Sequence, residues 1–418
     1  MTKASKKKVT PLDAVKGSSS SATAAAACIA AMSKGDLSTK IRIGICGLPN
    51  VGKSSLFNAL ARRSQAQAEN YPFCTIEPNV AQIAIPDPYL DRLAHLDKST
   101  KAIPAHLEFV DVAGLVAGAS RGEGLGNKFL ANIRECEAII HVLRNYDDGR
   151  VVHVNSEIDP KKDAEIINTE LQLADLAHIE RRLERSNCTG EERDALESLL
   201  PKMKEGIPAR SCGLAPAAAF AIKSLGLLTL KPVLYAFNVS RHAFLFERDG
   251  ALEEAKKLVK SVRFSDPSQD LCAIVSAKLE ARLSKLNEEE RIEHMQKVGV
   301  DQSLIAIVDR NMCYNSLPKL ISELLHLGLV YTGPGVASSR SSSTKAYVIR
   351  RAGAPTAIQM AGKLHGDIQK GFIKCEVISA EKLLEYPSYT AAHLAGAVLI
   401  HGKSHVLQCN DVILIKYK

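Results

Sequence analysis

The chain has 418 residues, of which 46% are hydrophobic and 24% charged, an ordinary composition for a soluble protein with two or three domains. No run of about 18 strongly apolar residues occurs, so the sequence predicts no membrane-spanning helix. The ten cysteines are scattered, and none forms a Cys-x-x-Cys pair. The sequence therefore indicates neither a zinc site nor a disulfide framework, and a reducing, cytoplasmic location fits best.

The net charge of +8 is distributed unevenly along the chain. Residues 1–40 contain seven Lys and two Asp, and residues 331–418 contain eleven Lys or Arg against five Asp or Glu. The two ends therefore carry +5 and +6, and the stretch between them sums to −3. This asymmetry is compatible with RNA contact through the ends, or with ordinary scatter of charge over a solvated surface.

Residues 1–39 are rich in Lys, Ser and Ala and contain no aromatic residue. Such a segment buries too little apolar surface to offset the entropy of ordering, so we expect a disordered basic tail. An organellar transit peptide is the alternative because acids are rare here. However, the segment has no Arg and no clear charged helical face.

Beyond the tail, apolar segments alternate with helical patterns. The expected strands cover residues 41–47, 106–111, 138–144, 233–239 and 271–276, and the first expected helix covers residues 56–63. Largely apolar strands separated by helices predict a mostly parallel sheet covered on both faces. We therefore expect an α/β domain formed by residues 40–147 and 213–330.

Residues 148–212 interrupt the series of strands. Apolar residues recur at helical spacing from Ile166 to Leu183, among many charges, and a second charged helix is expected at residues 191–205. This pattern predicts an antiparallel helical hairpin inserted between two strands. Its apolar stripe is most simply a packing seam between helices, and only weakly a surface for a partner.

The C-terminal part follows a Ser-rich linker, VASSRSSST, at residues 336–344. Strands are expected at residues 347–350 and 412–417, with a mixed, β-rich module between them. We expect residues 331–418 to form a separate domain.

The segment GLPNVGKS, residues 47–54, lies between the first expected strand and the first expected helix, which is the context of a phosphate-binding loop. Lys53 would reach the β- and γ-phosphates during hydrolysis, and the Ser54 hydroxyl would bind Mg²⁺. A potassium ion held near the phosphates by Asn50 is a further hypothesis. The residues expected to contact the phosphates are Asn50, Val51, Gly52, Lys53, Ser54 and Ser55.

The second motif is the apolar strand LEFVD, residues 107–111, which ends in a carboxylate and leads to Gly114. This is the Walker B arrangement: Asp111 would orient Mg²⁺, and the Gly114 amide would contact the γ-phosphate. Between the two motifs, the loop at residues 71–78 has one aliphatic hydroxyl, Thr75. We expect Thr75 to bind Mg²⁺ only while the γ-phosphate is present, so the motifs together predict a switch-type NTPase.

Base selection depends on the segment after the strand at residues 233–237. Guanine-binding proteins have Asn-Lys-x-Asp there, whereas this chain has Asn238, Val239, Ser240 and Arg241. A guanidinium has only donors and cannot accept from guanine, so ATP is favoured over GTP. The alternative is that Arg241 points to solvent and Val239 packs, which leaves selectivity to backbone groups. The remaining base-contact loop is expected at Ser276, Ala277 and Lys278.

The expected catalytic machinery lacks one part. Ras-like enzymes orient the attacking water with a Gln directly after Asp-x-x-Gly, and this chain has Leu115 there. Unassisted hydrolysis should therefore be slow. His153, beside the expected hinge into the helical insert, is a candidate replacement, with a purely structural role as the alternative. His141 lies in an apolar strand and is interpreted as a satisfied core histidine.

Several longer stretches resemble the Obg-like ATPases, also called the YchF family, over roughly residues 40–418. The stretch at residues 109–130 is long and separates this family from general Ras-like GTPases. The matching strings are GLPNVGKSSLFNAL (47–60), NYPFCTIEPNV (70–80), FVDVAGLVAGASRGEGLGNKFL (109–130), INTELQLADL (167–176), SAKLE (276–280) and HGDIQKGF (365–372).

The resemblance implies a Ras-like P-loop core, an inserted helical coiled coil and a C-terminal β-grasp domain of the TGS type. It also implies ATP preferred over GTP, association with ribosomes, contact of Asn238 and Val239 with the base, and a family histidine at His153. Three positions depart from the family pattern. Arg241 replaces a usual Glu, Tyr347 replaces a usual Trp, and Asn410 stands where Gly is common.

Three functions remain open at this point. The first is a slow, Mg²⁺-dependent ATPase, monomeric, that switches conformation on the ribosome or ribosomal RNA. The second is a GTPase or an NTPase of dual specificity. The third is a protein that binds ribosomes or RNA and needs nucleotide only for stability.

Overall fold

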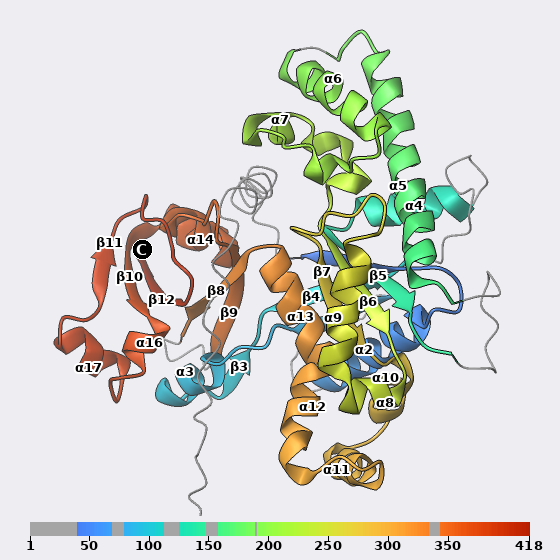
Figure 1. Ribbon diagram of the computed structural model, residues 1–418. Helices are drawn as coiled ribbons and strands as arrows, with labels where there is room; N and C mark the ends of the chain where they lie inside the picture. The colour runs from blue at the N-terminus through green and yellow to red at the C-terminus, as the bar shows by residue number, and fades with distance from the viewer. Residues whose placement is uncertain (1–39, 69–78, 113–124, 148–157, 189, 334–342) are drawn as a thin grey trace, which may run out of the picture.

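The computed structural model describes residues 40–68, 79–112, 125–147, 158–188, 190–333 and 343–418. Two six-stranded sheets organise these residues, and a helical arm projects from the first sheet (Figure 1). The basic tail expected at residues 1–39 lies outside the described residues. Within the described ranges, no helix has the length and apolarity needed to cross a membrane.

The first sheet has the strand order β2-β4-β1-β5-β6-β7, and only β2 is antiparallel to its neighbour. The five apolar strands expected from the sequence are confirmed. The edge strand β2 was not expected, because a short strand with alternating burial depends on its pairing with β4. The strands are β1 (Arg42–Cys46), β2 (Val80–Ala84), β4 (His106–Asp111), β5 (Ala138–Arg144), β6 (Val233–Asn238) and β7 (Leu271–Val275).

Helices cover both faces of this sheet (Figure 1). The β5 strand is buried at every position, which explains its continuous apolar sequence. One capping box begins α11, where Asn287 and Glu290 satisfy each other's main-chain N–H groups. The helices are α2 (Lys53–Ala68), α4 (Leu125–Arg134), α8 (Arg241–Phe246), α9 (Arg248–Val259), α10 (Ala277–Leu283), α11 (Glu288–Lys297), α12 (Ile305–Asn311) and α13 (Cys313–Leu324).

The helical arm contains the expected hairpin, formed by α5 (Pro160–Leu183) and α6 (Gly190–Lys204). The first half of α5 packs into the main core, and from Ile179 onward it packs into a second apolar cluster. That cluster continues to Leu230, beyond the expected limit of the insert at residue 212. The additional elements are η2 (Ala209–Ser211), α7 (Pro216–Ala221), η3 (Lys223–Leu225) and η4 (Leu228–Leu230).

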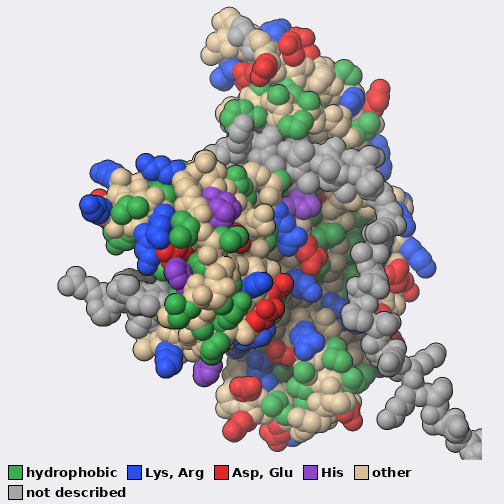
Figure 2. Space-filling view, turned by 90° about the vertical axis from the view of Figure 1, so that its left-hand side faces the viewer, with side chains coloured by type: hydrophobic (Ala, Val, Ile, Leu, Met, Phe, Trp, Pro, Cys, Tyr) green, Lys and Arg blue, Asp and Glu red, His purple; other side chains and the backbone are tan. Residues whose placement is uncertain are grey.

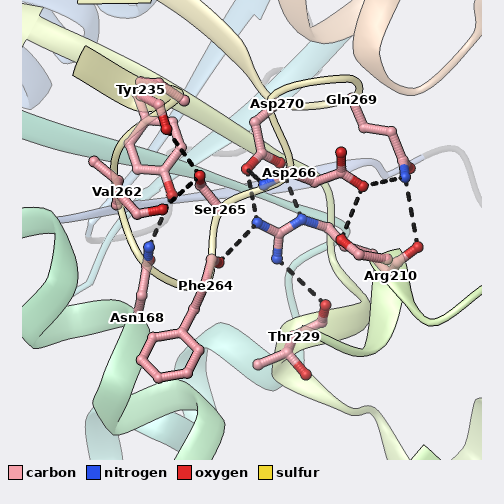
Figure 3. A network of polar contacts seen from close by, with 12 residues as sticks. Asn168, Arg210, Thr229, Tyr235, Val262, Phe264, Ser265, Asp266, Gln269 and Asp270 are labelled. Atoms are coloured by element: carbon pink, nitrogen blue, oxygen red, sulfur yellow. Dashed lines mark hydrogen bonds and ion pairs between the residues drawn. The ribbon is translucent and has the colours of Figure 1, made fainter. Parts of the chain in front are cut away.

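A buried polar network joins the arm to the first sheet (Figure 3). Arg210 donates to both carboxylate oxygens of Asp270, at 3.0 and 2.7 Å, and both side chains are almost completely buried. The Asn168 side chain on α5 donates to the Tyr235 hydroxyl on β6 at 2.9 Å. Each buried polar group shown here has a partner, so the network holds the arm in one position relative to β6 and β7.

The second sheet has the order β11-β10-β12-β8-β9-β3 and mixed strand directions. Helix α14 packs on one face, which fits the expected β-grasp class. Two strands come from N-terminal to the expected boundary at residue 331: all of β3 and most of β8. The elements are β3 (Lys101–Ile103), β8 (Leu327–Thr332), β9 (Ser343–Arg350), α14 (Ala357–Leu364), α15 (Gly366–Lys370), β10 (Phe372–Ser379), α16 (Ala380–Leu383), α17 (Tyr389–Leu394), β11 (Leu399–His401) and β12 (Asp411–Tyr417).

Contacts across the junction fix the second sheet against the first domain. The Tyr331 hydroxyl donates to Asp87, beside α3 (Leu90–Leu96), at 2.9 Å, and Arg350 forms an ion pair with Glu137. The main apolar core also continues into this sheet. Figure 2 looks onto the C-terminal domain and shows Lys and Arg side chains along its outer edge, as its positive charge predicts.

Candidate nucleotide-binding site

The loop between β1 and α2 lies at the carboxyl edge of the first sheet, between the ends of β4 and β5. Three of its residues have positive φ: Gly47 (151°), Asn50 (63°) and Gly52 (104°). A Cβ on Gly47 would lie 2.5 Å from the Val142 carbonyl oxygen. Only glycine therefore fits this position without displacing the backbone. Turns of this kind point several main-chain N–H groups at one place, as anion binding requires.

Lys53 is the first residue of α2 and is only 8% exposed. Its ammonium donates to the Leu48 carbonyl oxygen at 2.7 Å and so lies over the loop. Burial lowers the pKa of Lys53, and the nearby Cys46 and Asp111 oppose this shift. A bound polyphosphate would likewise favour the charged ammonium.

The first turn of α2 presents Ser54 and Ser55 to solvent, and this turn contains no acidic residue. Both hydroxyls are therefore free to face a ligand at the positive end of the helix. These positions agree with the predicted contact of both serines with phosphates and of Ser54 with Mg²⁺.

Asp111 ends β4, and the parallel register places it beside Ile45, just before the loop. Burial raises the pKa of this half-buried carboxyl, and Lys53 opposes the shift. Among the described residues, no donor forms a hydrogen bond with the carboxylate. An unpartnered carboxylate and an exposed Ser54 hydroxyl at one sheet edge are the oxygen ligands that Mg²⁺ prefers, so these residues fit the ion.

Asn238 locks the loop to the neighbouring strand. Its amide nitrogen donates to the Val51 carbonyl oxygen at 2.8 Å, and its amide oxygen accepts from the Ala277 main-chain N–H at 2.9 Å. A Cβ on Gly52 would lie 2.4 Å from the same amide nitrogen. These contacts give Asn238 a positioning role. One hydrogen of its NH₂ group is left over, so the contact with the base stays a prediction.

The rest of the expected base-contact set is mostly buried. Val239 is 4% exposed and packs in the core, and its carbonyl accepts from the Ser276 hydroxyl at 3.2 Å. Ala277 is also buried, whereas Lys278 is exposed. The side chains of Val239 and Ser276 therefore pack inside the domain, and Lys278 is the one exposed side chain of the predicted base-contact set.

Arg241 is exposed at the start of α8, where Ser240 caps the helix by accepting from the Ala243 N–H at 3.1 Å. Of the two interpretations given above, this arrangement matches the one in which Arg241 points to solvent and Val239 packs. In either case the segment offers no carboxylate to guanine.

His141 is a core residue, as expected, but it is not fully satisfied. It is 1% exposed, its ring lies 5.5 Å from that of Tyr235, and its Nε2 has no partner among the described residues. Burial lowers the pKa of His141 to about 3, so the ring is neutral. Four other predicted site residues lie outside the described residues: Thr75, Gly114, Leu115 and His153.

Comparison with known proteins places this geometry in context. A family model described as a 50S ribosome-binding GTPase matches residues 42–181. A model for the C-terminal region of YchF GTPases, described as a protein of unknown function, matches residues 339–418.

Individual relatives match almost the whole chain. The ribosome-binding ATPase YchF from Escherichia coli is 39% identical over 380 residues, which are 89% of this chain and 98% of that protein. Obg-like ATPase 1 from Caenorhabditis elegans is 34% identical over 394 residues, 92% of this chain and 93% of that protein. A solved structure of the Schizosaccharomyces pombe YchF GTPase matches with a TM-score of 0.76 and 31% identity, over 92% of this chain and 99% of that one.

Proposed function

Because the chain belongs to the YchF family of P-loop NTPases, we propose that it hydrolyses ATP slowly to ADP and phosphate and acts as a nucleotide-dependent switch on the ribosome. The observation that carries the proposal is the loop at residues 47–52, which lies at the carboxyl edge of the sheet with Lys53 and Asp111 beside it. The names of the relatives support ribosome binding.

The chain's own residues have distinct parts in this reaction. Main-chain N–H groups of the loop hold the phosphates, and Lys53 gives up its contact with Leu48 to approach the β- and γ-phosphates. Ser54 and Asp111, with Thr75, would hold Mg²⁺, which would supply positive charge to neutralise the phosphate oxygens. The Gly114 amide contacts the γ-phosphate, and Asn50 contributes to a potassium site.

Water activation is the weak step of the proposed mechanism. Leu115 stands at the position of the water-orienting Gln and has no polar group. We propose that His153 supplies this function when it approaches the γ-phosphate, and that turnover is slow otherwise. If His153→Ala leaves turnover unchanged, another group must orient the water.

The remaining assignments complete the proposal. We propose that the NTPase domain, the helical insert and the TGS domain occupy the expected parts of the chain after a basic tail, with the insert extended to Leu230 and the TGS domain beginning with β8. The protein is a cytoplasmic monomer with ribosomal RNA among its partners.

ATP specificity is tested by measuring ATP and GTP binding by calorimetry, with and without purified ribosomes. Since Arg241 replaces the carboxylate that accepts from guanine, ATP should bind more tightly. GTP binding that is tighter by about tenfold, or 1.4 kcal/mol, contradicts this assignment. The second candidate, a GTPase, is favoured by the name of the Schizosaccharomyces pombe relative.

Hydrolysis and switching are tested separately. Lys53→Ala should lower kcat/KM for ATP by about a hundredfold or more, because it removes a charge that the transition state needs. Full cellular activity in this variant indicates that hydrolysis is vestigial. Co-sedimentation with ribosomes should differ between ATP and ADP, and binding that ignores the nucleotide excludes the switch.

A further inference from the structure

The helical arm carries a basic pocket that has no part in the nucleotide site. One wall is formed by His178, Arg181 and Arg182 on α5 and by Arg185 just beyond the end of that helix. The three helical residues lie within about 100° of arc on one helix face. Ser224 and Leu225 of η3 form the opposite wall, and the pocket has a volume of about 280 Å³.

The positive charge of this pocket is largely unbalanced. Glu192 is the only carboxylate among the described lining residues, and Arg182 already binds it at 2.8 and 2.7 Å. Arg181 and Arg185 are exposed, and no carboxylate of the described chain lies within ion-pair distance of either. Arg181 donates through its Nε to the Ala177 carbonyl oxygen at 2.9 Å, so its two terminal nitrogens and the Arg185 guanidinium are available to a ligand.

A further arginine from another helix lies next to the pocket wall formed by Leu225. Arg134 at the end of α4 donates to the carbonyl oxygens of Leu225 and Gly226, at 3.2 and 3.0 Å. Burial lowers the pKa of His178, and Arg134, Arg181 and Arg185 lower it further. Arg182 acts in the same direction, so four arginines lie near the His178 ring.

The helix dipole explains only part of this arrangement. Cations in the last turn of a helix complement its carbonyl end, which accounts for Arg181 and Arg182. It does not account for Arg185, which lies beyond the last helical residue, or for Arg134, which belongs to α4. Like charges held together without counter-charges repel one another, and a bound anion removes this cost.

We propose that this pocket binds the phosphodiester backbone of RNA, with Arg181 and Arg185 as the contacting residues; the proposal deepens the ribosome association proposed above and rests on it. Guanidinium groups match phosphate oxygens in pairs of hydrogen bonds. No aromatic side chain lines the described pocket, so it has no platform for a base. These features suit the backbone of a polyanion rather than a free nucleotide.

The test uses the full-length protein and the double variant Arg181→Ala, Arg185→Ala. The matched control is Lys162→Ala, Lys204→Ala, which removes the same charge from two exposed positions of the same arm outside the pocket. The probe is a labelled single-stranded RNA of about 20 nucleotides, titrated at several salt concentrations. ATP turnover and thermal unfolding are measured on the same samples.

We expect the double variant to bind RNA about tenfold more weakly, with a salt slope less steep by about 1.4 because two phosphate contacts are lost. The control should bind RNA as the parent does, and all three proteins should hydrolyse ATP equally. Unchanged RNA affinity and slope in the double variant overturn the proposal. Polyglutamate that competes with the RNA at equal charge concentration also overturns it, in favour of an acidic protein segment.

This design distinguishes a failure of the proposed enzyme function from a failure of the proposed RNA site. If ATP turnover is absent in the parent protein, the proposed enzyme function fails whatever the RNA result is. If turnover and ribosome binding persist in the double variant while RNA binding is unchanged, only the pocket assignment fails.

Discussion

The P-loop and the basic pocket of the helical arm are proposed to hold phosphate in two different ways. In the P-loop, the proposed ligands are main-chain N–H groups and one buried lysine, and positive φ angles at Gly47, Asn50 and Gly52 shape the path. In the arm, the proposed ligands are exposed guanidinium groups on a helix surface. The first site should select its ligand by shape and the second by charge. The binding affinity of the second site alone should therefore depend steeply on the salt concentration.

The largest loss of stability is expected in the buried polar network that joins the helical arm to the first sheet. Asp270→Ala leaves the Arg210 guanidinium buried without its carboxylate, which should lower the free energy of unfolding by about 3–5 kcal/mol. Urea unfolding, followed by circular dichroism, measures this change.

The control for this prediction is an exposed pair in the arm. Lys204→Ala removes a contact with Glu180 in which both side chains are exposed, so the expected loss is at most about 1 kcal/mol. Equal losses in the two variants would show that the joint is no more stabilising than a surface ion pair.

The next largest effect is a pH dependence of stability, and its sign should differ between the core and the arm. Glu280 on α10 is 2% exposed, accepts from the Cys313 N–H at 2.7 Å, and has its pKa raised by burial to about 7 from 4.5. The folded state therefore holds this proton more tightly than the unfolded state. Stability should fall by about 3 kcal/mol as the pH rises from about 4.5 to about 7, and Glu280→Gln should flatten this dependence.

The arm should respond in the opposite direction. A hydrogen bond from Arg182 lowers the pKa of Glu192, so the stability that this pair adds is present above the ordinary glutamate pKa and is lost as the pH falls. Unfolding of the parent and the Glu280→Gln variant across this pH range checks the sign. A stability that rises with pH only in the parent would contradict the assignment of Glu280.

The smallest change in stability is expected in the phosphate-binding loop between β1 and α2. Gly52→Ala places a Cβ 2.4 Å from the Asn238 amide nitrogen at a φ of 104°, which should cost about 1–3 kcal/mol. Because Asn238 also holds Val51, we expect ATP affinity to fall by about tenfold or more. Thermal unfolding and calorimetry measure the two effects.

A second glycine provides the control. Gly250 lies within α9, and an added Cβ there would meet no atom within 4 Å. Gly250→Ala should therefore raise stability by about 0.5–1 kcal/mol and leave ATP binding unchanged. Similar effects from the two substitutions would indicate that Gly52 is not constrained by Asn238.

The sequence predicted the parts of the fold whose signals are local. The five apolar strands of the first sheet and the two helices of the arm were recognised from periodicity, and the loop at residues 47–54 from its spacing. The roles of Asn238 and Val239 were harder to predict. An asparagine at the end of a strand suits base contact and loop positioning equally well, and only the tertiary structure shows that Asn238 also holds Val51.

The domain boundaries were also hard to predict from the sequence. Strand β3 joins the second sheet through β9, although the two strands lie far apart in the chain. Its three residues carry no pattern of their own, since a short edge strand is defined by its partner. Similarly, Ile222 and Leu230 belong to the apolar cluster of the arm because of how η3 and η4 fold back on it.

The sequence by itself determined the chemistry of the nucleotide site, because a phosphate loop needs only a short run of residues after a strand and before a helix. The tertiary structure alone decided which residues hold that loop in place and where positive charge accumulates. Asn238 meets Val51 across 187 positions of the chain, and Arg134 meets Leu225 across 91. Such contacts arise from packing between distant segments, and no local pattern specifies them.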